Sequence, residues 1–331
     1  MRVPWPPPCL YRAFHTGSRL SQQRDKSIHS PLARRLFNLP PTPTPPTQNH
    51  HDLSSFLSYA ARISLSETST TYIGTHYEYT VQETLRRYSF SLHRVGGRAD
   101  AGIDLAGTWH VPPPRIGSQR HRRAQHPPLR VVAQCKALRA KLGPNLVREL
   151  EGAFRYSLPG FRTEWKLGML VSPREATKGV RDALARSPFP LMWMMMDRGG
   201  SIAQVLWNAR VEDNLGLRPL CVEKRYRLPS ADGEGKDARP TQEVVLTWDG
   251  QELPHMDLVE EDMARREKEW SATWGGQEMT ETEREEMLSL VQDASPGVAL
   301  ENINPQELQA KKGEFLSVLQ RRKAGSEHMS S

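Results

Sequence analysis

The spacing of apolar side chains becomes regular from about residue 52. Apolar residues first recur three and four positions apart, which is the spacing of one face of an α-helix. The positions are Leu53, Phe56, Leu57, Ala60 and Ile63. The same period returns over 76–88, at Tyr77, Val81, Leu85 and Tyr88. The pattern therefore predicts two helices at the beginning of the folded part of the chain.

Short apolar segments follow, bounded by turn-forming residues, as is typical of β-strands. We expect strands over 90–95, 102–109, 129–138, 165–171, 190–196 and 202–207, the last at a sheet edge. Helices are expected after Gly143-Pro144-Asn145 and over 175–186. This interleaving predicts an α/β fold with a mixed central sheet flanked by helices. The order of helix, three strands, helix and strand is that of the restriction-endonuclease-like core.

Composition indicates that part of the 331-residue chain lies outside this core. Apolar residues make up 37%, below the usual ~45–50%. The 26 prolines crowd the first 50 residues and the 110–128 stretch. No run of 18 apolar residues exists, which argues against a membrane span. The cysteines Cys9, Cys135 and Cys221 lack the spacing of a zinc site or a disulfide framework.

Charge is unevenly distributed along the chain. The net charge is +7, but residues 251–295 hold 13 acidic and 4 basic side chains, so the remainder carries +16. A basic body of this size attracts phosphates at long range. Basic proteins without such a partner are also common, so charge alone does not establish a nucleic-acid partner.

The first 30 residues resemble a mitochondrial presequence. They contain five basic residues and one acid, and prolines near the start rule out a secretory apolar core. A plain disordered tail is the alternative. We therefore divide the chain into a presequence (1–30), a Pro-rich linker (31–51), a folded domain (52–227) and a polar, then acidic tail (228–331). The tail has helical periodicity over 257–270 and 278–292, and serves either as a docking arm or acidic cover, or as partly disordered solvated chain.

Candidate chemistry lies on the second and third strands. Asp104 follows Gly102-Ile103, and Gln134 and Lys136 lie two apart, so they share one face of a strand while Cys135 points to the other. Hydrolysis of a phosphodiester needs a metal, and Mg²⁺ prefers oxygen ligands. Asp104 and Gln134 are the expected metal ligands, and Lys136 would orient water or stabilise the phosphorus. Glu78 could supply a second carboxylate from the preceding helix.

Each of these residues also has a structural explanation. Thr75 and Glu78 have the spacing of a capping box, which would begin the helix there. Asp100 can shape the turn after Gly96-Gly97, and Gln134 can be an ordinary strand residue. Lys136 is harder to explain structurally, because an unpaired lysine in an apolar strand is costly.

A basic loop separates the second and third strands. Within 110–128 the cations are Arg115, Arg120, Arg122 and Arg123. Such a loop beside a nuclease site could grip the phosphates of DNA or RNA. A solvated insertion without a role is the alternative.

Several motifs in order resemble a known family. They are 74–79 (Gly-Thr-His-Tyr-Glu-Tyr), 92–97 (Leu-His-Arg-Val-Gly-Gly), 100–105, Gln134-Cys135-Lys136, 148–152, 176–181 and 206–208. Over about 70–227 the chain is similar to the fungal mitochondrial family "required for respiratory growth protein 7". That family is similar in turn to Mrr-type restriction endonucleases, with their Gly-Ile-Asp and Gln-x-Lys motifs.

The resemblance implies a mitochondrial location and a need for the protein in respiratory growth. By matching position, Glu78 takes the helix carboxylate, Asp104 and Gln134 the metal-ligand places and Lys136 the catalytic-lysine place. Glutamine stands where many such nucleases have an acid, and a neutral amide binds Mg²⁺ less strongly. Two functions are compatible with this: a nuclease-like or nucleic-acid-binding protein in mitochondrial genome maintenance or expression, and a catalytically inactive matrix protein that uses the fold for binding or assembly.

Overall fold

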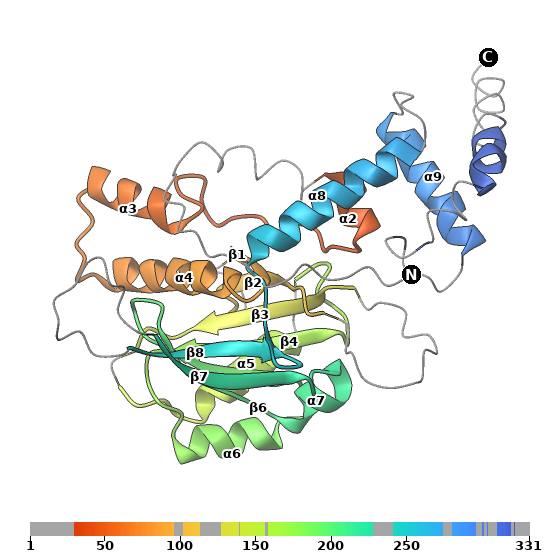
Figure 1. The fold of residues 1–331 in the computed structure, drawn as a ribbon. Helices are drawn as coiled ribbons and strands as arrows, with labels where there is room; N and C mark the ends of the chain where they lie inside the picture. The colour runs from red at the N-terminus through yellow and green to blue at the C-terminus, as the bar shows by residue number, and fades with distance from the viewer. Residues whose placement is uncertain are drawn as a thin grey trace.

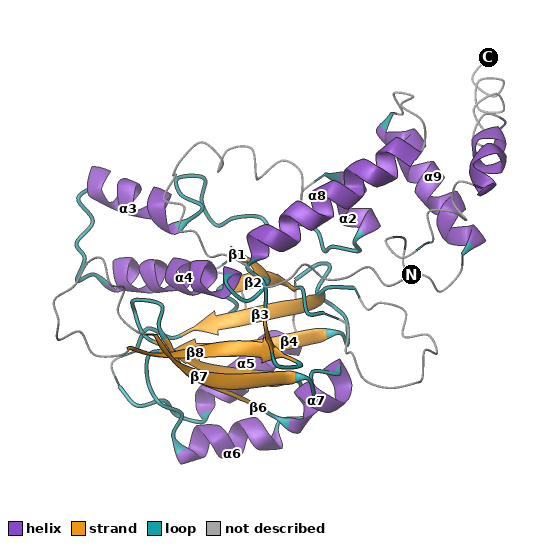
Figure 2. Ribbon diagram, in the orientation of Figure 1, coloured by secondary structure: helices purple, strands orange, loops and turns teal. Residues whose placement is uncertain are grey.

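The central element of the computed structural model is a six-stranded mixed sheet (Figures 1 and 2). The structure describes residues 30–95, 102–112, 127–138, 140–155, 158–227, 241–273, 280–295, 300, 303, 310–318 and 321. The presequence to residue 29, the Gly96-Gly97 turn with Asp100, and the loop arginines Arg115, Arg120, Arg122 and Arg123 lie outside these ranges.

The sheet has the order β1-β2-β3-β4-β5-β6. Its strands are β1 (Phe90–Arg94), β2 (Leu105–Trp109), β3 (Leu129–Cys135), β4 (Lys166–Ser172), β5 (Leu191–Met196) and β6 (Ile202–Trp207). Strands β3, β4 and β5 run parallel, and the other neighbours pair antiparallel. The predicted mixed sheet flanked by helices is therefore confirmed, as is the edge position of β6.

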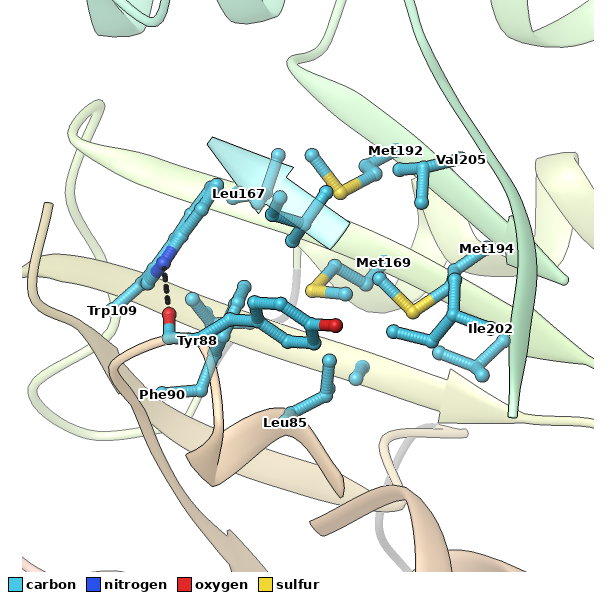
Figure 3. Packing of buried hydrophobic residues seen from close by; sticks show 14 of the residues in the cluster. Leu85, Tyr88, Phe90, Trp109, Leu167, Met169, Met192, Met194, Ile202 and Val205 are labelled. Atoms are coloured by element: carbon cyan, nitrogen blue, oxygen red, sulfur yellow. Dashed lines mark hydrogen bonds between the residues drawn. The ribbon is translucent and has the colours of Figure 1, made fainter. Parts of the chain in front are cut away.

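One face of the sheet is covered by helix α4 (Thr70–Arg86) and helix α7 (Ala209–Leu215). The β-hairpin of β7 (Leu220–Arg227) and β8 (Thr241–Trp248) covers the same face. Figure 3 shows the core beneath them, where Met169, Met192 and Met194 pack with Leu85 and Tyr88. The indole N–H of Trp109 donates to the Tyr88 carbonyl at 2.9 Å. Because an apolar strand buried on both faces needs no polar alternation, 191–196 reads as a continuous hydrophobic run.

The other face is covered by α5 (Asn145–Arg155) and α6 (Lys178–Arg186). Val147, Leu150 and Phe154 of α5 pack on Val132 and Leu170 of the sheet. The crossovers from β3 to β4 and from β4 to β5 thus each carry one helix, as parallel strands require.

Helix α4 begins earlier than the sequence pattern indicated. Its N-cap is Ser69, whose hydroxyl accepts the Tyr72 N–H at 3.1 Å. Thr75 lies inside the helix and is buried, so the capping box of Thr75 with Glu78 is wrong. Helix α3 (Leu53–Arg62), capped by Asp52, packs on α4 through Phe56 and Tyr79.

The folded core continues past residue 227. Strand β7 (Leu220–Arg227) pairs with β8 (Thr241–Trp248), and β8 pairs with the short β9 (Gln251–Glu252). Val244, Leu246 and Trp248 belong to the main core cluster. The predicted domain boundary at 227 therefore falls between two paired strands. Strand β8 was assigned to the tail because the sequence around it is polar.

The two ends of the described chain meet in a third cluster. Helix α2 (Pro31–Leu36) lies within the predicted Pro-rich linker and packs against α8 (Met256–Thr273) and α9 (Glu281–Ala294). The Ser30 hydroxyl donates to Glu267 at 2.6 Å, and Arg35 donates to Ser289 at 2.6 Å. The predicted helices of the acidic tail are present, and in these ranges they are packed rather than isolated. None of the described helices is long and apolar enough to span a bilayer.

Candidate functional site

Asp104 is fixed between two strands just before β2 begins. Its N–H donates to the Ala133 carbonyl at 2.9 Å, and its own carbonyl accepts the Val95 N–H at 2.9 Å. Its carboxylate oxygen Oδ2 accepts the backbone N–H of Cys135 at 2.7 Å. Asp104 was expected to meet Gln134 and Lys136 across the β2–β3 hairpin. The structure shows its carboxylate bonded to the backbone of Cys135, the residue between them, while β2 itself starts one residue later.

Gly102 shapes the approach to Asp104. Its φ of 82° lies in the left-handed region, which glycine adopts without a Cβ penalty. A Cβ at this position would lie 3.0 Å from Nε2 of Gln134. The Gly102-Ile103-Asp104 motif thus needs glycine both for its backbone and for the room that Gln134 occupies.

Gln134 is the least satisfied polar residue of the group. Its side chain is 3% exposed, and its Oε1 has no hydrogen-bond partner among the described residues. A buried acceptor without a partner costs about 1–3 kcal/mol. Gln82 Oε1 is buried without a partner in the same way, so the Gln134 oxygen is available to a ligand without by itself marking a site.

Lys136 lies one residue beyond β3 rather than inside it. Its N–H still donates to the Val171 carbonyl at 2.8 Å, so the backbone stays in line with β4. Its Nζ lies 3.4 Å from the carboxylate of Glu149 on α5, with 26% of the side chain exposed. Cys135 packs on the opposite, α4 side of the sheet, as the two-residue alternation predicts.

Glu78 lies in the middle of α4, and its carboxylate forms an ion pair with Nε of Arg94 at the end of β1. The two side chains are 13% and 16% exposed. The Arg94 guanidinium also lies 5.8 Å from the centre of the Tyr79 ring. Arg94 therefore holds the Glu78 carboxylate in one position.

The charged groups converge on the end of β3. Burial raises the pKa of the Cys135 thiol well above its usual value, and the negative charges of Asp104 and Glu78 raise it further. The Lys136 charge lowers the same pKa. Asp104 bonds to the Cys135 N–H, Lys136 follows Cys135, and Glu78 pairs with Arg94 at the end of β1, so Glu78, Asp104 and Lys136 lie at the same end of the sheet.

The donor atoms suit a magnesium ion better than a transition metal. In the described parts of the chain, no three His, Cys, Asp or Glu side chains gather into a metal-binding group. Mg²⁺ needs no such group, because one or two carboxylates plus water and phosphate suffice. Asp104 and Gln134, the ligands expected from the sequence, both offer oxygen atoms.

Two partners of these residues were missed by sequence reasoning. Arg94 and Glu149 lie in the 92–97 and 148–152 motifs, and those motifs were the available signal. Their roles depend on pairing with Glu78 and Lys136 across separate elements, which no local pattern encodes.

A small pocket lies elsewhere, between the Pro-rich segment and strands β1 and β2. Its cavity volume is about 30 Å³, and Pro41, His93 and His110 are among its lining residues. Burial lowers the pKa of His110 to about 4. None of the candidate residues lines this pocket, so the candidate chemistry is not located there.

Together these features define a mixed α/β protein with a cluster of acidic, amide and lysine side chains at the end of its third strand. The family model for required for respiratory growth protein 7 matches residues 69–224. An uncharacterized mitochondrial protein of Schizosaccharomyces pombe is 31% identical over 216 residues, covering 64% of this chain and 76% of the relative. The chain belongs to the required for respiratory growth protein 7 family.

Two further relatives carry the family name with the word mitochondrial. The protein of Saccharomyces cerevisiae (strain ATCC 204508 / S288c) is 28% identical over 160 residues, covering 39% of this chain and 66% of its own length. That of Lachancea thermotolerans is 30% identical over 158 residues, covering 39% and 62%. No solved structure matches the chain.

Proposed function

We propose that this chain is a mitochondrial protein required for respiratory growth that cleaves phosphodiester bonds of DNA or RNA with Mg²⁺. The observation that carries the proposal is the contact of Asp104 with the Cys135 N–H beside the partnerless oxygen of Gln134. The order α4, β1, β2, β3, α5, β4 supports a restriction-endonuclease-like core. The names of the relatives support the mitochondrial location and the respiratory role.

In this proposal Asp104 and Gln134 hold the metal, and Glu78 adds a carboxylate at its edge. Bound Mg²⁺ supplies charge neutralisation and a lower pKa for the attacking water. The Cys135 N–H fixes the orientation of the Asp104 carboxylate through one oxygen. Lys136, held near the site by Glu149, turns toward the phosphate to orient the water or stabilise charge at phosphorus.

The basic loop has a functional role in the same proposal. Arg115, Arg120, Arg122 and Arg123 connect β2 to β3, the two strands that frame Asp104 and Gln134. The expectation that this loop lies beside the site needs a correction, because the loop leaves β2 at Trp109 and enters β3 at Leu129, which pair at the end of the strands opposite to Asp104 and Gln134. These cations would therefore hold the nucleic-acid backbone at a distance from the cleaved bond. Their sequence position and the basic body of the protein are the support for this part.

The test is Mg²⁺-dependent cleavage by the purified chain, with supercoiled DNA and a single-stranded RNA as substrates. Asp104→Asn should abolish cleavage, while Asp213→Asn, which alters an exposed aspartate paired with Arg218, should leave it unchanged. Equal cleavage by wild type and Asp104→Asn would remove the site assignment. Absence of cleavage by the wild type in both substrates and a range of Mg²⁺ would remove the enzymatic proposal.

A second candidate is a catalytically inactive matrix protein that uses the fold for binding or assembly. Two ion pairs favour it, because Glu78 with Arg94 and Lys136 with Glu149 satisfy the charged groups without a ligand. Complementation separates the two functions. In a fungus lacking the gene, an Asp104→Asn/Lys136→Ala variant that accumulates in mitochondria should fail to support growth on a respiratory carbon source if the site acts. Full rescue would establish the second candidate.

A further inference from the structure

Three loops meet at the end of the central sheet where the candidate residues lie. Strands β3, β4 and β5 are parallel, so the loops that follow them leave from the same end. The Thr177 hydroxyl in the second loop donates to the Leu142 carbonyl in the first at 3.0 Å. Arg198 in the third loop donates to the Ala137 carbonyl of the first at 3.1 Å. These bonds connect the three loops into one rim that starts at Lys136.

The rim carries exposed cations from all three loops. They are Lys141 after β3, Arg174 and Lys178 after β4, and Arg198 after β5. Within the described ranges, no ion pair joins any of these four to an acid.

The acids near the rim are fewer than its cations. Asp197 accepts the N–H groups of Gly199 and Ser201 at 2.8 Å each, and Glu149 faces Lys136. Glu175 is exposed at the rim. Glu78 and Asp104 also lie at this end of the sheet, as do Arg94 and Lys136, so five acids stand against six cations. The net charge is +1, and the exposed cations without an ion pair are those of the three loops.

Helices α5 and α6 begin at the rim, and Thr177 caps α6 by accepting the Val180 N–H at 3.3 Å. Neither α5 nor α6 has an acid in its first turn, and Lys178 is the first residue of α6. A cation at a helix N-terminus is disfavoured by the helix dipole and the unpaired N–H groups, whereas an anion is favoured. The rim cations therefore do not serve their own helices, and an anion above the rim would relieve their repulsion.

We propose that the phosphodiester backbone of a nucleic acid lies across this rim, contacting Lys141, Arg174 and Lys178. A polyanion fits because cations spread over three loops exceed what a single phosphate can neutralise. The choice of a nucleic acid as the polyanion rests on the proposed function, since Asp104, Gln134 and Lys136 lie at the same end of the sheet. Such contacts position the strand and carry no base preference. The three contact residues are separate in sequence from the 110–128 loop.

The experiment compares two triple variants of the full chain with equal change in net charge. The rim variant is Lys141→Gln/Arg174→Gln/Lys178→Gln. The control is Arg162→Gln/Arg186→Gln/Arg210→Gln, three exposed cations at the opposite end of the sheet, before β4, at the end of α6 and after β6. Fluorescence anisotropy with labelled duplex DNA and single-stranded RNA, in chelator and at several salt concentrations, measures affinity without cleavage.

The rim variant should bind at least about tenfold more weakly at low salt. For duplex DNA, the slope of the logarithm of the binding constant against the logarithm of the salt concentration should fall in magnitude by about 2–3, because each lost phosphate contact contributes ~0.9. The control variant should stay near the wild type. Equal loss in both variants, or loss in neither, would overturn the proposal. If the wild type does not cleave with Mg²⁺ while the rim variant alone loses binding in chelator, the nuclease is refuted and the rim stays in place.

Discussion

The guanidinium of Arg94 on β1 is ion-paired with the carboxylate of Glu78 on α4, and both side chains are mostly buried. Arg94→Met would leave a largely buried carboxylate without its partner. The expected loss is about 2–3 kcal/mol of unfolding free energy, below the ~3–5 kcal/mol of a fully buried pair. Urea unfolding followed by circular dichroism measures it.

The double variant Arg94→Met/Glu78→Gln is the matched control for that ion pair. Since it removes both charges, it should recover more than half of the stability lost in Arg94→Met. A double variant as unstable as the single one would show that Arg94 acts through packing on Tyr79 instead.

Gly102→Ala should destabilise the protein by about 1–2 kcal/mol, because alanine is strained at positive φ and its Cβ would press on Gln134. Gly152→Ala is the control, since nothing lies within 4 Å of a Cβ added at that α5 position. There alanine should stabilise by about 0.5–1 kcal/mol through its helix propensity. Equal shifts of the urea midpoint in both variants would contradict the strain at Gly102.

Lys166 gives the folded protein a specific pH dependence of stability. The residue is 3% exposed, and its ammonium donates to the Phe154 carbonyl at 2.6 Å and lies 4.1 Å from the centre of the Phe154 ring. Burial lowers its pKa from 10.5 to about 8. Between these two values the unfolded chain binds more protons at this site than the folded one, so its contribution to stability rises with pH.

The measurement is urea unfolding of wild type and Lys166→Met at pH 7.5 and 9.5. The wild type should gain stability relative to the variant as pH rises. Other groups, such as Cys135 with its raised pKa, contribute less to the unfolding free energy as pH rises over this range. They are common to both proteins, so their effect cancels in the difference. Parallel pH profiles would contradict the lowered pKa of Lys166.

Leu246 tests whether β8 belongs to the main fold. Its side chain is fully buried, at 0% exposure, in the core between the hairpin and the sheet. Leu246→Ala should cost about 2–5 kcal/mol, whereas Leu258→Ala, at a leucine 59% exposed on α8, should stay within about 0.5 kcal/mol. A small effect at Leu246 would mean that the hairpin contributes little to the folded domain.

Metal binding can be measured apart from catalysis. If Asp104 and Gln134 hold Mg²⁺, added Mg²⁺ should raise the melting temperature of the wild type, because a ligand that binds the folded state stabilises it by mass action. The Asp104→Asn variant should show no such rise, and chelator should reverse it in the wild type. An equal rise in both proteins would place the ion elsewhere.

Local patterns predicted most of the central domain. The period of 3.6 residues at Leu53–Ile63 and the short apolar runs that became β3, β4 and β5 depend only on neighbours in the chain, so they could be recognised without the fold. The Gly102-Ile103-Asp104 and Gln134-Cys135-Lys136 motifs were visible in the same way. The two-residue alternation placed Cys135 opposite Lys136, as the structure has it.

Boundaries were less predictable, because they depend on which cap and which strand partner prevail. Ser69 caps α4 in place of Thr75, whose side chain is buried within the helix. Strand β8 was missed because its partner β7 is separated from it by a polar segment, and pairing between distant segments leaves no local period.

The sequence by itself thus determined the types of most core elements, the candidate residues and the family, since each is written in short-range spacing or in ordered motifs. Only the tertiary structure decided that Arg94 pairs with Glu78, that Glu149 meets Lys136, and that Ser30 reaches Glu267 across 237 positions. The reason is physical. These contacts form between elements brought together by burial of the apolar faces, and the free energy of that burial depends on the whole chain rather than on any one segment.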